Sequence, residues 1–167
     1  MKIDRHTLTK DFAPFASIVG EGDMERIREA AVRDKFGEAG FYGMTVGDFT
    51  TVLSGDPRPL LQSGGRTVFD ACRVDAFKAF VTDDLAVKLQ RLTLPPTAET
   101  MKMNAGTLPM EFVESLYTFC RAYFGLPSFK AVDGLLVSEL LQAKKDEYNR
   151  AVVDRNVAAS IKKGGRP

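Results

Sequence analysis

The stretch SFKAVDGLLVSELLQAKKDEYNRAVVDRNVAASIK, residues 128–162, decides the fold. It contains no proline, and its only glycine is Gly134. Apolar residues recur at helical spacing, densely at first and more thinly after Ala143, which predicts one long helix with Ser128 as its N-cap. Such a helix would span about 50 Å, whereas a compact domain of this length measures about 40 Å across. We therefore expect either a break in the helix or a far end that projects beyond the core.

Two more long helices are predicted upstream of this stretch. Residues 67–92 carry an apolar stripe that follows the capping residue Thr67 and ends before two prolines. Residues 109–124 carry an apolar face that is wider than one stripe, which favours a central position in the bundle. Phe112, Leu116 and Phe119 of this helix are expected to be core residues.

Shorter helices are predicted before residue 60, where glycine and proline repeatedly interrupt the apolar pattern. One is expected to begin near Pro14, and another to span residues 24–36 with Asp23 as its N-cap. A third spans residues 45–53, with Thr45 in the capping position.

These segments predict an all-α fold with a small N-terminal helical region and a C-terminal bundle of three long helices, the last one projecting. We expect a single domain over residues 1–162. The short-helix region covers residues 1–59 and the three long helices cover residues 67–162. Residues 163–167 are expected to form a disordered tail.

The composition is that of a globular protein with a core, and its charge is unevenly distributed. Hydrophobic residues make up 44% of the 167 residues and charged residues 27%, with a net charge of +1. Residues 142–167 hold seven Lys or Arg and three Asp or Glu, a local charge of +4 that leaves −3 for the rest. This basic end could contact phosphate, but cations also suit a helix C-terminus, and we favour that second interpretation.

Residues that could bind a metal or a cofactor are few. Cys72 and Cys120 lie 48 positions apart among apolar neighbours, with no CxxC motif, which predicts buried free thiols. His6 is the only histidine, and with Asp4 it supplies only two ligands. Asp83 and Asp84 point about 100° apart on a helix and are expected to lie on a solvated face. We therefore expect no metal site, no cofactor and no catalytic residues.

Two segments have some features of a nucleic-acid or phosphate site. Residues 63–67 read SGGRT before a predicted helix, as a phosphate loop would, but they lack the lysine and the preceding strand, so a flexible connection is favoured. Residues 24–61 resemble a helix-turn-helix in outline, yet Pro57 and Pro59 would disrupt a recognition helix. DNA binding through this region is therefore not favoured.

The expected location is intracellular. No apolar run approaches the roughly 18 residues of a membrane span, and the first ten residues hold no apolar stretch of the signal-peptide type. Two isolated cysteines suit a reducing compartment. We expect the protein in the cytoplasm or within a viral particle, without a membrane partner.

The predicted function is that of a non-enzymatic assembly, adaptor or scaffold protein of a multi-subunit particle, phage virions included. The reason is the long, thinly apolar last helix combined with the lack of a catalytic constellation. This helix is expected to bind a protein partner or a second copy, through the residues Tyr148, Val152, Val157 and Ile161.

The alternative is a small nucleic-acid-binding or regulatory module that uses the basic end of the chain. The possible phosphate contacts are Lys144, Lys145, Arg150, Arg155, Lys162 and Lys163. Asp146 with Arg150, and Arg150 with Asp154, have the i,i+4 spacing of ion pairs and would occupy part of this positive charge. Nucleic acid is therefore the less favoured partner.

Overall fold

The computed structural model describes residues 3–97, 101 and 111–164, and the side chains among them up to Ile161. Over these residues the fold is all-α, as predicted; no strand forms within them, and the β-structure is limited to two isolated bridges. The predicted disordered tail lies largely outside the described residues, and its first two positions continue the last helix.

The N-terminal region consists of short helices, as expected. In order they are α1 (Thr9–Phe12), η1 (Ala13–Phe15), α2 (Glu21–Phe36), η2 (Gly37–Gly43), α3 (Val46–Leu53) and η3 (Arg58–Leu60). Thr45 caps α3 as predicted, since its hydroxyl accepts a hydrogen bond from the backbone N–H of Asp48 at 3.1 Å. The prediction for α2 was wrong by three residues: the helix begins at Glu21 after Gly20, and Asp23 lies in its first turn.

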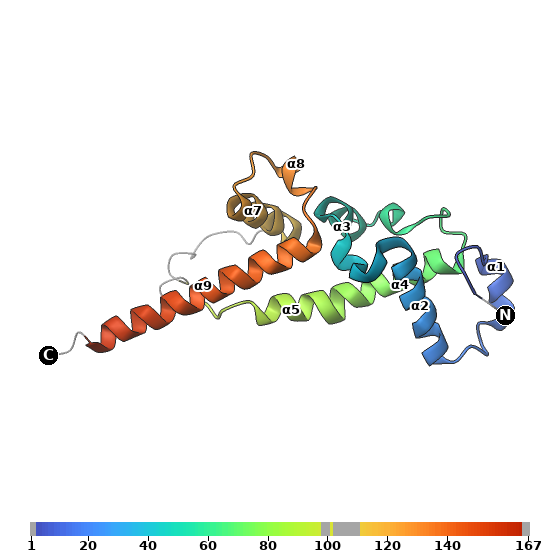
Figure 1. Ribbon diagram of the computed structural model, residues 1–167, viewed down its shortest axis with the longest axis horizontal. Coiled ribbons are helices and arrows are strands. Elements are labelled where there is room, and N and C mark those ends of the chain that lie inside the picture. The colour runs from blue at the N-terminus through green and yellow to red at the C-terminus, as the bar shows by residue number, and fades with distance from the viewer. Residues whose placement is uncertain (1–2, 98–100, 102–110, 165–167) are drawn as a thin grey trace.

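The first long helix forms as predicted, with one irregularity. It comprises α4 (Val68–Ala79), the π-helical segment η4 (Phe80–Leu85) and α5 (Ala86–Arg91). Thr67 is its N-cap and accepts a hydrogen bond from the backbone N–H of Asp70 at 3.2 Å. Figure 1 shows α4, η4 and α5 as one continuous helical rod, and α2 crosses this rod near the N-terminal end of the rod.

The stretch that was predicted as one helix is divided in two. After α7 (Phe112–Phe124) come the short α8 (Phe129–Val132), capped by Ser128 as predicted, and then α9 (Val137–Gly164). Both outcomes considered for the long stretch therefore occur: it breaks at residues 133–136, and its far end projects (Figure 1).

The break is made by contacts with the start of α3. The carbonyl of Leu135 accepts from the N–H of Val46 at 2.7 Å, and the N–H of Val137 donates to the carbonyl of Met44 at 2.9 Å. A Cβ on Gly47 would lie 2.9 Å from the Cβ of Asp133, so this close approach requires glycine. The backbone groups at the break are thus satisfied by a segment about 90 residues away rather than by a continuous helix.

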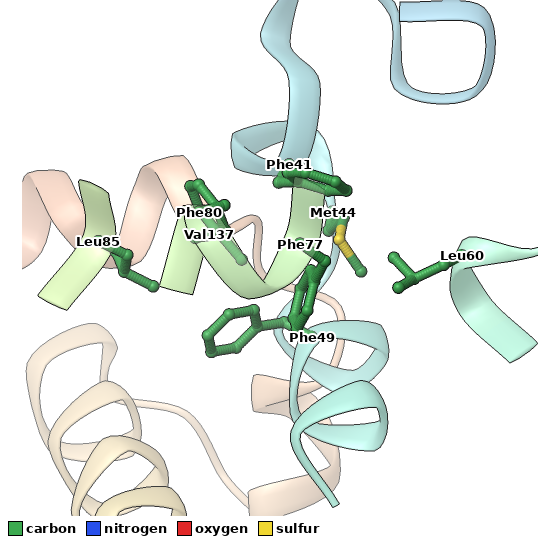
Figure 2. Close-up of a cluster of buried hydrophobic side chains, with 8 residues drawn as sticks. All are labelled: Phe41, Met44, Phe49, Leu60, Phe77, Phe80, Leu85 and Val137. Atoms are coloured by element: carbon green, nitrogen blue, oxygen red, sulfur yellow. The ribbon is translucent and has the colours of Figure 1, made fainter. Parts of the chain in front are cut away.

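The largest core cluster joins the N-terminal region to the long helices. Figure 2 shows its eight buried residues, which come from η2, the turn after it, α3, η3, the first long helix and α9: Phe41, Met44, Phe49, Leu60, Phe77, Phe80, Leu85 and Val137. Phe41 packs edge-on to Phe77 with ring centroids 5.4 Å apart. The short helices and the long helices therefore pack together in this cluster.

The expected core residues of α7 are only partly confirmed. Leu116 is buried, together with Cys120, in a second cluster that includes Val46 and Leu140. Phe119 is half-buried and packs against the edge of this cluster, so its prediction is confirmed in part. Phe112 is 52% exposed, so its prediction was wrong. The wide apolar face of α7 is therefore not fully covered by the rest of the described chain.

Candidate interface on the C-terminal helix

The first third of α9 is anchored in the core. Val137, Leu140, Leu141 and Ala143 are buried. Val137 packs in the cluster with Phe49 of α3, and Leu140 packs in the cluster with Leu116 of α7. At about 1.5 Å per residue the 28 residues of α9 extend for about 42 Å. Figure 1 shows that the C-terminal part of α9 projects past the ends of α5 and α7.

The middle of α9 is held against α7 by polar and aromatic contacts. The ammonium group of Lys144 lies 3.4 Å from the centroid of the Phe119 ring and 2.9 Å from the carboxylate of Glu147. The hydroxyl of Tyr123 donates to Asp146 at 3.1 Å. Burial and this hydrogen bond raise the pKa of Tyr123, so it stays protonated and can serve as the donor.

Two of the four predicted partner-binding residues face the body of the protein. Tyr148 lines a groove of about 360 Å³ between α5, α7 and α9, together with Leu89, Leu92 and Leu116. Val152, one turn further along, is half-buried. These two residues belong to the side of α9 that packs inward.

The other two predicted residues lie on an exposed face, and a third residue joins them. Val157 and Ile161 are 52% and 69% exposed, and Val153, which sequence reasoning missed, is 57% exposed. The three residues follow one another at i, i+4 and i+8, so they share one side of the helix. We call this set, Val153, Val157 and Ile161, the aliphatic ridge. Val153 lies four residues before Val157, and this spacing could have identified it from the sequence.

A hollow lies beside the ridge, between α7 and α9. It has a volume of about 420 Å³ and is lined by Phe119, Ala122 and Tyr123 from α7 and by Glu147, Arg150, Ala151 and Asp154 from α9. The guanidinium group of Arg150 lies 5.9 Å from the centroid of the Tyr123 ring. The hollow thus has aromatic and aliphatic walls with charged groups along one edge.

Two of the six predicted phosphate contacts already have partners within their own chain. Lys144 packs on Phe119, and Arg155 donates to the carbonyl of Pro95 at 2.7 Å. The Lys145 side chain is exposed. Lys162 and Lys163 lie in α9, and the structure does not describe their side chains.

The predicted ion pairs of Arg150 are absent from the described part of α9. Asp146 instead accepts from Tyr123 and Gln142. Arg150 lies near the Tyr123 ring, and no ion pair joins it to Asp154 among the described side chains. For Asp146 and Arg150 the prediction was wrong because Tyr123 of α7 contacts both residues, which spacing along one helix could not reveal.

The glycine-rich segment 63–67 is held in place rather than flexible. The backbone N–H groups of Gln62, Ser63 and Gly65 donate to the carboxylate of Asp70 at 2.9–3.0 Å. These are the donors that a bound phosphate would need. The loop therefore binds an anion supplied by its own chain.

Asp70 in turn forms a buried ion pair with Arg73, which sequence analysis did not detect. Their side chains are almost fully buried and lie 2.8 Å apart. Arg73 also donates to Asp34, Gln62 and the carbonyls of Ala31 and Leu60. Every group of the pair is thus satisfied, as buried charges require.

Burial alone would raise the pKa of Asp70, but other interactions outweigh it. The backbone N–H donors and the positive charge of Arg73 together lower the pKa of this carboxyl below its usual value. Asp70 is therefore ionised at neutral pH and connects the loop to α4. The cluster is structural, because the groups that could bind a ligand already bind one another.

Other reactive side chains in the described part of the chain lie apart from one another. Cys72 and Cys120 are buried free thiols, as predicted, and burial raises the pKa of Cys120 to about 11. Asp84 is not simply solvated: it accepts from Tyr42 at 2.8 Å and pairs with Lys88 at 2.6 Å. Within the described chain no group of three His, Cys, Asp or Glu residues could hold a metal ion.

Comparison with known proteins does not assign this chain to a family. No protein-family model, curated protein or solved structure matches it. Among the helices of the described segments, none is long and apolar enough to cross a membrane.

Proposed function

We propose that this chain is a non-enzymatic assembly or adaptor protein that binds another protein chain through the projecting end of α9. The observation that carries the proposal is the aliphatic ridge. Three large aliphatic side chains on one face of a projecting helix are each more than half exposed. Burying them against a partner would be favourable, at about 25 cal/mol per Å² of apolar surface.

The form of the ridge supports recognition of a protein. An amphipathic helix enters a groove or pairs with another helix through apolar anchors three or four residues apart, and the ridge has the four-residue spacing. As part of this proposal, we place the protein among the assembly proteins of multi-subunit particles, phage particles included.

Nucleic-acid binding remains the alternative, and the structure gives it less support. Lys144 and Arg155 already contact groups of their own chain. A nucleic-acid interface on α9 should lose affinity steeply with salt, since each neutralised phosphate releases a counterion. A protein interface built on the ridge should respond weakly to salt, because apolar burial is not screened.

A photo-reactive amino acid at Val157 tests the proposal in cells that express the chain. The crosslinked products should contain a protein, whether another copy of this chain or a different partner. The matched control places the same probe at the neighbouring Asn156, which lies off the ridge, and should give far fewer products. Equal yields from both positions, or products that contain only nucleic acid, would contradict the proposed function.

Removal of residues 153–167 should separate assembly from folding. The truncated chain keeps the buried start of α9 as well as Lys144 and Tyr148, so its cooperative thermal unfolding should be nearly unchanged. It should lose assembly, measured as the mass in solution by light scattering. A large loss of stability instead would show that the ridge belongs to the core of the protein.

A further inference from the structure

An apolar pocket lies between α3, η3 and the first long helix. It has a volume of about 440 Å³ and shares no lining residue with α9. Two buried members of the core cluster, Leu60 and Phe77, line it, and Figure 2 shows Leu60 pointing toward Phe77. The other large apolar residues that line it are half-buried and pack against the same cluster: Val52, Leu53, Val74 and Val81. A molecule in this pocket would therefore contact the core directly.

The polar side chains around the pocket supply a positive charge and no negative one. Lys78 lines the pocket, and no carboxylate among the described side chains does so. The two hollows beside α9, by contrast, are both lined by Glu147. Thr82 also lines the pocket, but its hydroxyl already donates to Asp83 at 2.7 Å. A charged group on a ligand in this pocket would therefore be favourable if it were an anion.

Lys78 is held only loosely within its own chain. Its ammonium group lies 3.8 Å from the carboxylate of Asp75, and the two side chains are 73% and 63% exposed. An exposed pair of this kind contributes little to stability, so exchanging Asp75 for another anion costs little. The apolar stem of a lysine can lie along a pocket wall while its ammonium group stays in water. Lys78 can therefore turn to an anion at the edge of the pocket.

The helix that forms one wall of the pocket is irregular at this position. Val81 and Thr82 belong to η4, the π-helical segment Phe80–Leu85 that interrupts the first long helix. A π-helical turn is rare, and it occurs frequently at functional sites. The irregular segment thus borders the pocket, which is an independent reason to regard this wall as part of a binding site.

We infer that this pocket binds a small molecule that has an apolar chain and one carboxylate, as a fatty acid does. The chain lies between the aliphatic walls and against Phe77, and the carboxylate pairs with Lys78. Binding sites for small molecules are typically concave and mostly apolar, with a few polar groups that orient the ligand. An apolar side chain of a protein partner could fill the walls, but it would bring no anion to Lys78. The site is separate from the aliphatic ridge, so the inference goes beyond the proposed function and is judged apart from it.

Titration calorimetry of the full chain with sodium decanoate tests the inference. We expect one molecule of decanoate to bind per chain. Over the series hexanoate, octanoate and decanoate, the affinity should rise about fourfold for each methylene that the pocket buries. A neutral or polar surface site would not show this dependence on chain length.

A larger side chain in the pocket should prevent binding. Val74→Phe adds a ring to a half-buried wall position and should abolish the binding of decanoate. Val87→Phe is the matched control, because it makes the same change on α5 at a position that is 36% exposed and outside the pocket. Circular dichroism should show cooperative thermal unfolding for both variants. If Val74→Phe does not fold, Val52→Phe fills the pocket from α3 instead.

The role of the charge is tested by Lys78→Met, which keeps an apolar stem and removes the ammonium group. It should weaken the binding of decanoate about threefold, as expected for an exposed ion pair, and it should leave the binding of decanol unchanged. Asp75→Asn should strengthen the binding of decanoate, because it removes the anion that competes for Lys78.

Three results would overturn the inference: no saturable binding of decanoate, an affinity that does not change with chain length, or full binding by a folded Val74→Phe or Val52→Phe variant. Equal effects of Lys78→Met on decanoate and decanol would overturn the assignment of a carboxylate ligand.

Discussion

Replacing Asp70 with alanine should lower the free energy of unfolding by about 3–5 kcal/mol, the usual cost of removing one member of a buried ion pair. The substitution leaves the guanidinium of Arg73 buried with Asp34 as its remaining charged partner, at 3.2 Å. It also leaves the N–H groups of Gln62, Ser63 and Gly65 without their acceptor. Denaturant unfolding followed by circular dichroism measures the loss.

Asp75→Ala is the matched control, because it removes a carboxylate from the same helix. Asp75 is exposed and pairs only loosely with Lys78, at 3.8 Å, so its loss should cost less than about 1 kcal/mol. Equal losses from the two substitutions would show that Asp70 contributes no more than a surface charge.

The pH dependence gives a second check on the contribution of Asp70. The pKa of Asp70 is lower in the folded protein than the unfolded value of 3.8, so its stabilisation is complete well above pH 3.8. The stabilisation is lost as the pH falls through the folded pKa. The difference in stability between the native protein and Asp70→Ala should therefore be constant at neutral pH and should narrow on acidification. A difference that grows on acidification would contradict this assignment.

Phe49→Ala should have an effect of the same size, about 3–5 kcal/mol, because it empties a packed aromatic position. Phe49 is fully buried in α3, with its ring centroid 5.7 Å from that of Phe77 and 6.5 Å from that of Phe80. It lies in the cluster that joins the short helices to the long ones (Figure 2). The substitution should therefore lower the stability of the whole domain in one cooperative transition.

Phe112→Ala is the control for this prediction, since Phe112 is the same residue type at 52% exposure. Because about half of Phe112 is already in contact with solvent, shortening it to alanine should leave almost no cavity. The free energy of unfolding should therefore fall by about 1 kcal/mol or less. If Phe112→Ala destabilised the protein as much as Phe49→Ala, then Phe112 would be covered in solution, by a partner or by a second copy.

Local patterns in the sequence were enough for most of the helices. Thr45, Thr67 and Ser128 cap the helices that they were predicted to cap, because an N-cap depends on a side chain and a backbone group only three residues apart. The burial of Cys72 and Cys120 followed in the same way from their apolar neighbours. Such features depend on residues that are close in the sequence.

The predictions that were wrong involve contacts between residues that are far apart in the sequence. The break before α9 follows from backbone hydrogen bonds between residues 44–47 and 133–137, which replace bonds of a continuous helix. Asp146 bonds with Tyr123 rather than with Arg150, because α7 lies beside α9. In each case a distant segment offered a better partner than the nearest one along the chain.

For the candidate site, too, some features follow from the sequence and others only from the tertiary structure. The sequence by itself determined that the last helix is long, thinly apolar and basic at its end, since periodicity and charge are properties of the chain. Only the tertiary structure decided that Tyr148 and Val152 face inward while Val153, Val157 and Ile161 face outward. The reason is that the exposed side of a helix is the side that its neighbours leave uncovered, and those neighbours are positioned by long-range packing.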